Sequence, residues 1–302
     1  MEWRVYRVMP GNKKLLLSLL LILISFVWAG SFIVVTLVTE EINPIDLGFL
    51  RFLVATPVMS VFLLLSRREV RIPLRELPSL AILGLTGVTL LYVFQFTGID
   101  YTNASTASVL INTNVIFIAL LSGLFLKEAF TLKKVTGITL SFLGVIIVVF
   151  SNLPSAQVAL DNLFFVGSVL VLLSALCWAV YSIVGKRLLE TYDTVTIITY
   201  AFILGTVFYL PLVIADIVPT IQTISVNGWI GVVYLALISS VFGYIGWYHV
   251  LRRTEASKAA VFLNLIPVFA VTMAFFLGET ITVFFLVGAI LIIYGVYLTQ
   301  KG

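Results

Sequence analysis

The sequence predicts an all-α integral membrane protein with ten transmembrane helices arranged as two inverted five-helix repeats. Three observations predict it: an apolar composition, a series of long apolar segments, and a similarity between the two halves of the chain. Apolar residues make up 61% of the 302 residues and charged residues only 11%, whereas a soluble domain carries roughly a quarter charged residues. The mean hydropathy is +1.16. A water-soluble fold cannot bury this much hydrocarbon surface, so the expected solvent is lipid.

Ten apolar segments account for nearly the whole chain. A helix needs about 20 mainly apolar residues to cross the hydrocarbon core of a bilayer. The segments that meet this length are 15–38, 44–65, 78–98, 103–126, 133–150, 164–188, 194–216, 228–250, 256–277 and 280–299. The first is too long for the apolar region of a secretory signal, so we expect it to remain as a membrane helix. The short connections leave no room for a nucleotide-hydrolysing domain.

The basic residues orient these segments, because cytoplasmic loops of membrane proteins carry an excess of Lys and Arg. With ten spans, 17 of the 18 basic residues fall on one side, and the exception is Arg51 inside the second span. The opposite side carries acidic residues without Lys or Arg, namely Glu40, Glu41, Asp46, Asp100, Asp161, Asp216 and Glu279. The prediction is a multi-pass protein of the plasma or inner cell membrane with both termini in the cytoplasm. The net charge of +4 follows from this topology and indicates no nucleic-acid partner.

The two halves of the chain match at an offset of about 150 residues. Trp28 aligns with Trp178, and Leu-Phe-Leu-Lys-Glu at 124–128 recurs as Phe-Phe-Leu-Gly-Glu at 275–279. Glycines of the fifth and tenth spans also match, namely Gly137 and Gly144 with Gly288 and Gly295. Each half has an odd number of spans, so the second half is inserted upside down. We therefore divide the chain into repeats at 1–151 and 152–302, an architecture typical of alternating-access transporters with a central substrate site.

Four short motifs add a family resemblance that covers nearly the whole chain. They are Trp-Ala-Gly-Ser at 28–31, Leu-Arg-Phe at 50–52, Thr-Asn-Ala-Ser-Thr-Ala at 102–107 and Leu-Ile-Pro-Val-Phe…Leu-Gly-Glu at 265–279. With them the sequence resembles the ten-helix, EamA-type members of the drug/metabolite transporter superfamily. The resemblance implies transport of amino acids, nucleosides or similar metabolites, often outward, through a cavity between the repeats. The chain departs from the family pattern at Ile116, where proline is common, so we expect the fourth helix to be straighter than the ninth.

Polar and aromatic side chains within the spans are the candidates for a substrate site, because such side chains usually face the bundle interior or a wet cavity. An aromatic box with a few amides suits a small, partly apolar ligand. The predicted substrate-binding residues are Trp28, Tyr92, Gln95, Ser108, Asn112, Trp178, Tyr181, Tyr244, Trp247, Tyr248 and Asn264. The alternative is that the amides hold helices together and that the Tyr and Trp side chains lie in interfacial belts.

Arg51 has two interpretations that the sequence leaves open. It is either one partner of a structural ion pair with Asp46, Glu40 or Glu41, with its side chain extended toward the membrane surface, or a hook for the carboxylate of an anionic or zwitterionic substrate. A charged side chain within a span is costly in lipid, so either role requires a partner for the guanidinium.

Three prolines lie within predicted spans and are expected to bend them. Pro57 and Pro211 are predicted hinges for a rocking motion of the two halves. Pro267 cannot donate a backbone hydrogen bond, so the carbonyl of Leu263 loses its usual partner. That carbonyl is either an acceptor in the cavity or part of a plain kink that neighbouring groups satisfy.

These observations favour a secondary, carrier-type transporter of small organic metabolites. The rivals are a membrane-embedded enzyme and a receptor or scaffold without transport activity. The sequence places no Asp, Glu or Lys in the middle of a span and has no metal-ligand cluster, so we expect no enzyme activity, cofactor or metal site. The expected partners are a small-molecule substrate and the lipid bilayer. The glycine-rich faces of the fifth and tenth spans are expected to support the fold or a contact between copies, as a monomer or weak homodimer.

Cysteine labelling in intact cells tests the predicted topology. Cysteines introduced at Asp161 and Glu279 are expected to react with an impermeant reagent from outside, whereas one at Lys134 is expected to be protected. The reason is the segregation of basic residues to one side. Reaction at position 134 with protection of positions 161 and 279 would contradict the inverted repeat.

Overall fold

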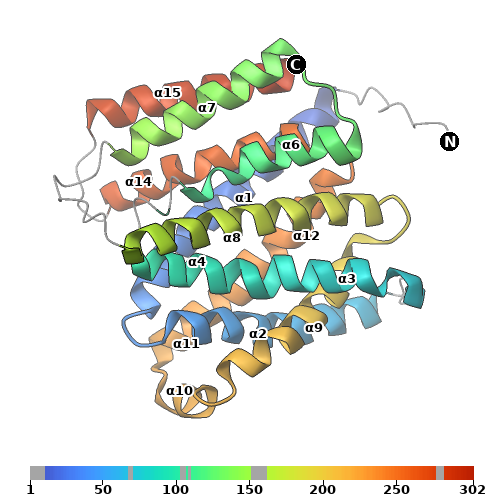
Figure 1. Ribbon diagram of the computed structural model, residues 1–302, viewed down its shortest axis with the longest axis vertical. Coiled ribbons are helices and arrows are strands. Elements are labelled where there is room, and N and C mark those ends of the chain that lie inside the picture. Colours follow the sequence, from blue (N-terminus) through green and yellow to red (C-terminus); the bar gives the residue numbers. More distant parts are fainter. Residues whose placement is uncertain (1–10, 67–70, 103–106, 108–109, 151–161, 277–281) are drawn as a thin grey trace.

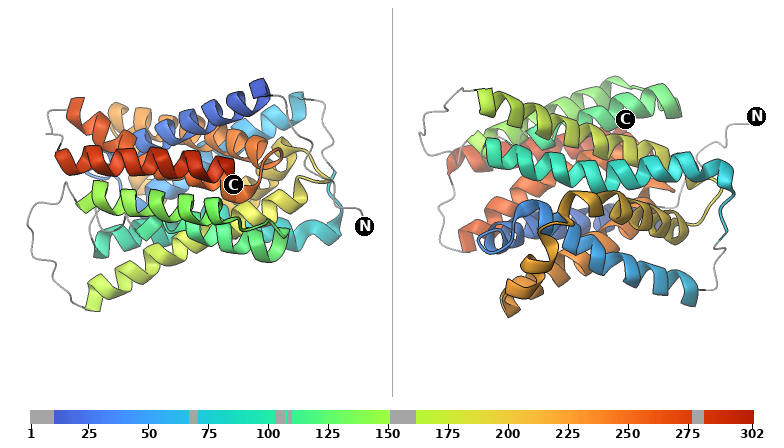
Figure 2. Two further views of the ribbon diagram at one scale, coloured as in Figure 1. Left: turned by 90° about the horizontal axis from the view of Figure 1, so that it is seen from above. Right: turned by 60° about the horizontal axis from the view of Figure 1, so that its bottom comes forward.

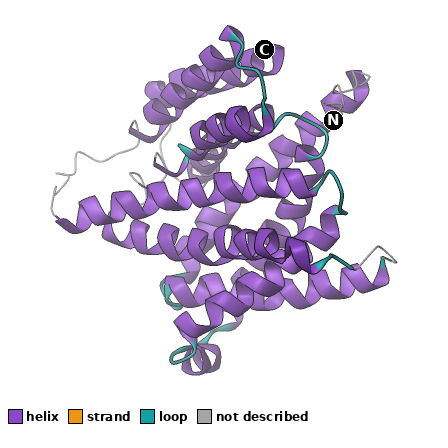
Figure 3. Cartoon of the chain, turned by 45° about the vertical axis from the view of Figure 1, so that its right-hand side comes forward, coloured by secondary structure: helices purple, strands orange, loops and turns teal. Residues whose placement is uncertain are grey.

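The structure of this chain is a computed structural model that describes residues 11–66, 71–102, 107, 110–150, 162–276 and 282–302. These residues form helices and short connections, with no strand among them (Figure 3). Eight helical segments are long and apolar enough to cross a membrane, and Asn114–Leu126 is a shorter apolar helix. The prediction of an all-helical membrane protein is therefore confirmed for the described part of the chain.

The helices of the first half follow the expected spans, with one break. They are α1 (Gly11–Val38), α2 (Pro44–Leu65), η1 (Leu74–Glu76), α3 (Leu77–Gly84), η2 (Leu85–Thr89), α4 (Leu90–Tyr101), α6 (Asn114–Leu126) and α7 (Leu132–Phe150). The fourth span is interrupted by a turn at Asn112 and Thr113 just before α6, and the ninth contains a 3-10-helical stretch at Val261–Leu265. Which of the two is straighter stays a prediction. The Thr113 hydroxyl donates to the carbonyl oxygen of Leu110 at 2.6 Å, so this carbonyl has a hydrogen-bond partner within the turn. Proline is therefore not needed to break this helix.

The second half repeats this order with one added helix. Its elements are α8 (Asn162–Leu188), α9 (Thr194–Val213), α10 (Ile217–Thr223), α11 (Val226–Val233), η3 (Tyr234–Phe242), α12 (Gly243–Leu251), α13 (Ala256–Ala260), η4 (Val261–Leu265), α14 (Ile266–Phe276) and α15 (Val283–Lys301). The short α10 was not expected from the sequence. It contacts the first half through Thr220, whose hydroxyl donates to Asp46 at 2.7 Å.

Several local features recur about 150 residues apart. The Asn43 side chain caps α2 by accepting from the Ile45 N–H at 2.9 Å, and Asp193 caps α9 by accepting from the Val195 N–H at 2.8 Å. Side chains with these oxygens are preferred at helix N-caps because they satisfy otherwise unpaired N–H groups. The third long helix of each half also contains a π-helical stretch, η2 in the first and η3 in the second.

The helices lie side by side, and the start of α1 and the end of α15 lie at the same end of the bundle (Figures 1 and 2). We call this the basic end, because its described turns and helix ends carry Lys127, Lys133, Lys134, Lys186, Arg187, Arg252, Arg253, Lys258 and Lys301. At one edge α7 and α15 run alongside each other (Figure 1). A Cβ atom added at Gly144 would lie 2.6 Å from the carbonyl oxygen of Gly288, and one at Gly137 would lie 2.6 Å from that of Gly295. The two backbones therefore approach as closely as only glycine permits.

Replacement of Gly144 by leucine tests this contact between α7 and α15. The added side chain must push the helices apart, and overpacking of this kind costs about 1–3 kcal/mol or more. We expect a lower melting temperature and a lower folded yield in detergent. The control is Thr139→Leu, because Thr139 lies on the same helix with its side chain exposed. Equal stability of the two variants would contradict the close approach.

Candidate functional site

A cavity of about 440 Å³ lies between the two halves of the chain. Its described walls come from α1, α2 and α4, the turn before α6, and α8, η3, α12, η4 and α14. Along α1 the lining residues run from Trp28 in mid-helix to the exposed Thr36 near the helix C-terminus. The cavity thus occupies the half of the bundle away from the basic end. No described residue of α7 or α15 lines it, as expected for helices that support the fold.

The structure brings many of the sequence-predicted site residues into this cavity wall. The lining includes the predicted residues Trp28, Tyr92, Gln95, Asn112, Trp178 and Tyr244, together with Arg51 and Pro267. Asn114, the first residue of α6, also lines the cavity. Leu263 lines the cavity as well. It lies in η4, a 3-10-helical stretch that ends two residues before Pro267.

The other predicted residues lie outside this lining. Tyr181, Trp247 and Tyr248 are fully buried behind the cavity wall. Asn264 donates to the Ser141 hydroxyl of α7 at 2.7 Å, a contact between helices. Ser108 falls outside the described residues. A substrate role for these five residues stays a prediction.

An aromatic cluster forms the inner wall of the cavity and continues toward the basic end. The indole rings of Trp28 and Trp178 meet edge to face with centroids 5.2 Å apart, and Trp178 stacks on Tyr181 at 5.4 Å. Tyr181 in turn stacks on Tyr248 at 4.9 Å. Offset and edge-to-face contacts of this kind add stabilisation beyond the buried area. The cluster therefore separates the cavity from the basic end by packed rings.

Arg51 forms no ion pair within 4.0 Å with any residue that the structure describes. Its Nε donates to the Ser240 hydroxyl at 3.0 Å, and its Nη2 donates to the hydroxyls of Ser240 at 2.8 Å and Ser239 at 3.2 Å. The guanidinium carbon lies 4.4 Å from the ring centroid of Tyr92, a cation–π contact. Arg51 is 3% exposed. The ion pair with Asp46, Glu40 or Glu41 that the sequence suggested is not found among the described residues.

The acids near Arg51 in sequence have other partners. Asp46 accepts from Thr220, as described above, and Glu41 accepts from the backbone N–H and the hydroxyl of Ser225. Both contacts hold the segment between α9 and α11, which connects two of the predicted spans. Asp46 and Glu41 therefore have partners in α10 and at Ser225, and neither pairs with the guanidinium of Arg51.

Sequence reasoning missed Ser239 and Ser240 as partners of Arg51. Both lie in the π-helical η3, where the Ser240 hydroxyl also donates to the Leu235 carbonyl five residues earlier at 2.9 Å. The Ser239 carbonyl accepts from the Trp28 indole N–H at 3.0 Å. Residue types do not predict a π-helical turn. Two adjacent serines within an apolar span could still have identified this position as a candidate site, and π-bulges often occur at functional sites.

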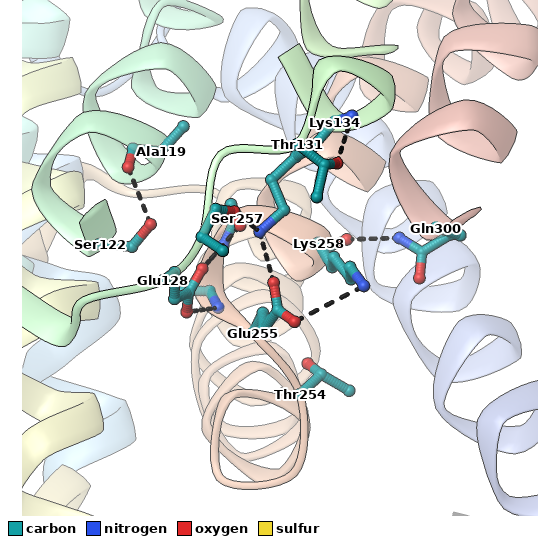
Figure 4. Close-up of polar contacts among 12 residues, drawn as sticks. Ala119, Ser122, Glu128, Thr131, Lys134, Thr254, Glu255, Ser257, Lys258 and Gln300 are labelled. Atoms are coloured by element: carbon teal, nitrogen blue, oxygen red, sulfur yellow. Dashed lines mark hydrogen bonds and ion pairs between the residues drawn. The ribbon is translucent and has the colours of Figure 1, made fainter. Parts of the chain in front are cut away.

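A second buried polar network closes the basic end (Figure 4). Glu128, in the turn between α6 and α7, accepts from the backbone N–H groups of Ala256 at 2.5 Å and Ser257 at 3.1 Å. It also accepts from the Ser257 hydroxyl at 2.6 Å, and Lys186 of α8 lies 3.1 Å away as an ion-pair partner. Lys186 further donates to the Thr254 carbonyl at 2.5 Å. One carboxylate from the first half therefore binds two separate segments of the second half.

Lys134 and Glu255 extend this network beside α13. Lys134 forms an ion pair with Glu255 and donates to the Ala129 carbonyl at 2.7 Å. The Lys134 side chain is 2% exposed, so burial alone would protect a cysteine at this position from labelling. The neighbouring Lys133 is exposed and is the position at which labelling reports the orientation of the chain.

The ionised form of Glu128 is favoured at neutral pH. Burial of the carboxyl favours its neutral form, but the Lys186 ammonium and the hydrogen bonds from Ser257 and Ala256 outweigh this effect and hold the pKa of Glu128 below its usual value. The side chains of Glu128 and Lys186 are 3% and 8% exposed. The network is therefore a buried ion pair with its remaining lone pairs satisfied, the condition under which such a pair is stable.

Comparison with known proteins gives a consistent result across the chain. The model of a family described as "EamA-like transporter family" matches residues 15–150 and again residues 165–300. A protein of Archaeoglobus fulgidus described as "Uncharacterized transporter" is 38% identical over 282 residues, which cover 93% of this chain and 96% of that protein.

Two more distant relatives have more specific descriptions. One from Streptantibioticus cattleyicolor, "Probable terminal-alkyne amino-acid exporter", is 29% identical over 93% of this chain and 92% of its own length. One from Salmonella typhimurium, "Probable amino-acid metabolite efflux pump", is 27% identical over 94% of both chains. A solved crystal structure of a protein with 18% identity has a TM-score of 0.79 and covers 94% of this chain and 96% of that chain. At this identity it shows that the fold is shared.

Replacement of Glu128 by glutamine tests the network at the basic end. Removal of one partner leaves the Lys186 charge buried, which costs about 3–5 kcal/mol, so the melting temperature at pH 7 is expected to fall clearly. Because the folded pKa of Glu128 is lowered, its contribution is full above the unfolded pKa of about 4.3 and is lost as the pH falls through the folded pKa. As the pH is lowered below this value, the melting temperature of the variant is therefore expected to fall less steeply than that of the wild type.

Glu190→Gln is the matched control, because Glu190 is exposed at the same end of the bundle and forms no ion pair with a described residue. Its melting curve is expected to follow the wild type at every pH. A Glu128→Gln variant that behaved like this control would show that the network contributes nothing measurable.

Proposed function

Because the chain belongs to the EamA-like transporter family, we propose that it is a secondary, carrier-type transporter of small organic metabolites. It moves its substrate by alternating access between two inverted repeats of five membrane helices. The observation that carries this proposal is a cavity between the halves that reaches the surface at Thr36 and is closed toward the basic end. A carrier needs such a one-sided site near the middle of the membrane.

Contacts between residues about 150 positions apart support the inverted repeat. The hydroxyls of Thr56 and Thr206 are 2.9 Å apart, and the Trp28 and Trp178 rings meet edge to face. In two repeats related by a twofold axis in the membrane plane, matching residues near the axis contact each other. The hydroxyls of Tyr92 and Tyr244, which lie 152 positions apart, are also within 3.1 Å.

The positive-inside rule gives this conformation a direction. If the basic end is cytoplasmic, the cavity faces outward and the Glu128 network is the cytoplasmic closure. Substrate exchange with the cytoplasm then requires Glu128 to leave Ala256 and Ser257 and the aromatic cluster to separate. Pro57 and Pro211, which lie inside α2 and α9, are the proposed hinges. The names of the two exporting relatives favour the outward direction of transport.

Transport by purified protein in liposomes tests the proposal. A thermal-shift screen of amino acids, nucleosides and organic acids selects ligands, since a ligand that binds the folded state raises the melting temperature. Saturable uptake of a selected ligand is the expected result. Flux that equals that of empty liposomes for every ligand in the screen would contradict a carrier and favour a receptor or scaffold.

Trp178→Ala tests the position of the site within the carrier. Loss of an aromatic contact worth about 1.4 kcal/mol or more would raise the apparent KM at least tenfold. Asn264→Ala is the comparison, because Asn264 binds Ser141 instead of lining the cavity. If that contact is only structural, this variant loses stability while the surviving protein keeps its KM. A wild-type KM in Trp178→Ala would place the substrate elsewhere.

A further inference from the structure

The charge of the cavity wall indicates what the proposed carrier transports. We infer that the substrate is an organic monoanion, with one carboxylate on an apolar or aromatic body, whose carboxylate binds Arg51. This inference rests on the proposed function and narrows it, because it disfavours neutral nucleosides and zwitterionic amino acids as the preferred substrates. It depends on Arg51, on the other residues of the wall, and on the absence of a second charge among the described lining residues.

Arg51 is a buried cation without a described counter-ion. Its hydrogen-bond acceptors are the hydroxyls of Ser239 and Ser240, which are neutral, and they engage only Nε and Nη2. No described residue accepts a hydrogen bond from Nη1. A buried charge is stable only when it is paired, and the cavity is the side from which a partner can approach.

The geometry around Arg51 suits a carboxylate. The guanidinium lies over the Tyr92 ring, with its carbon 4.4 Å from the ring centroid, so one face is covered. Ser239 and Ser240 hold part of its edge, and the side chain itself lines the cavity. A planar guanidinium recognises a carboxylate through parallel N–H donors along its edge. Fixing the plane on Tyr92 before the ligand arrives reduces the ordering that binding requires.

Among its described residues the same wall holds no negative charge for an ammonium group. Arg51 is the one charged residue among the lining residues that the structure describes. The other polar groups that line the cavity are uncharged: the amides of Gln95, Asn112 and Asn114, the hydroxyls of Ser31, Thr36, Tyr92, Ser239 and Tyr244, and the indole N–H groups of Trp28 and Trp178. A zwitterion would bring its positive charge into a cavity whose fixed charge is also positive. An anion without an ammonium makes the favourable contact and avoids this repulsion.

The rest of the wall is suited to an apolar body. It is formed by the rings of Trp28, Trp178 and Tyr244 and by aliphatic residues of α1, α4 and α14. Aromatic side chains present large apolar faces, and burial of the ligand body against them supplies the non-directional part of the affinity. The bound molecule would therefore point its carboxylate toward Arg51 on α2 and its body toward the tryptophans.

Four small probes with similar aromatic skeletons and different charges test this inference. They are 3-phenylpropanoate (an anion), phenylalanine (a zwitterion), 3-phenylpropanamide (neutral) and 3-phenylpropylamine (a cation). Binding of each to the purified full-length protein at pH 7 is measured by calorimetry. We expect the anion to bind at least tenfold more tightly than any of the other three. Equal or tighter binding of phenylalanine or of the amide by the wild type would overturn the inference.

Arg51→Gln and Arg51→Lys assign the preference to the guanidinium. In Arg51→Gln the affinity for 3-phenylpropanoate is expected to fall at least tenfold, while that for 3-phenylpropanamide changes less than twofold. Arg51→Lys keeps the charge but loses the paired donors, so an intermediate affinity is expected. Unchanged affinity for the anion in Arg51→Gln would overturn the inference. The wild-type comparison of the four probes decides the question even if the variants fail to fold.

Failure of this inference is distinguishable from failure of the proposed function. Saturable uptake of amino acids or nucleosides, with no preference for the anionic probe, would overturn the inference and leave the carrier standing. Absence of saturable uptake for the probes and for the whole screen would overturn the carrier itself. Tight binding of the anion that Arg51→Gln abolishes, together with its saturable uptake, would support both.

Discussion

A charged side chain removed from water must find an opposite charge or a full set of hydrogen bonds, because the loss of hydration otherwise costs several kcal/mol. Two side chains of the first half meet this constraint differently. Glu128 is completely satisfied by Lys186, Ala256 and Ser257. The described partners of Arg51 are the hydroxyls of Ser239 and Ser240 and the rings of Tyr92 and Phe52. The complete network closes one end of the bundle, and the incomplete one lies in the wall of the cavity.

Contacts between the halves close the basic end, whereas the cavity reaches the surface at the other end. Glu128 joins the first half to two segments of the second at the basic end, and the aromatic cluster packs between this contact and the cavity. The close approach of α7 and α15 through glycine lies at the edge of the bundle (Figure 1), away from the lining. In a carrier these helices would keep the halves together while the contacts at Glu128 break and re-form, so that stability and motion depend on different elements.

The sequence predicted the all-helical membrane class, the order of the spans and much of the cavity wall. Composition and span length determine the class and the order of the spans. Trp28 and Trp178 lie at mid-span, where aromatic groups face inward, and both line the cavity. Local geometry was less predictable. The π-helical turns, the break at Asn112 and Thr113 and the short α10 depend on backbone hydrogen bonding and tertiary contacts, which residue type and hydropathy do not encode. The partner of Arg51 was misjudged because α10 and Ser225 occupy the nearby acids.

The central claim is that the two halves alternate between closure at the basic end and closure at the other end. Spin labels at the exposed residues Lys133 and Arg187 report the basic end, and labels at Asp100 and Phe276 report the opposite end. Pulsed electron spin resonance measures the distance between the labels at positions 133 and 187 and the distance between those at positions 100 and 276. Both are measured in the wild type and in Glu128→Gln. Alternating access predicts that the variant gains a population with a longer distance at the basic end and a shorter one at the opposite end. Distances that stay unchanged, or that lengthen at both ends together, would contradict the claim.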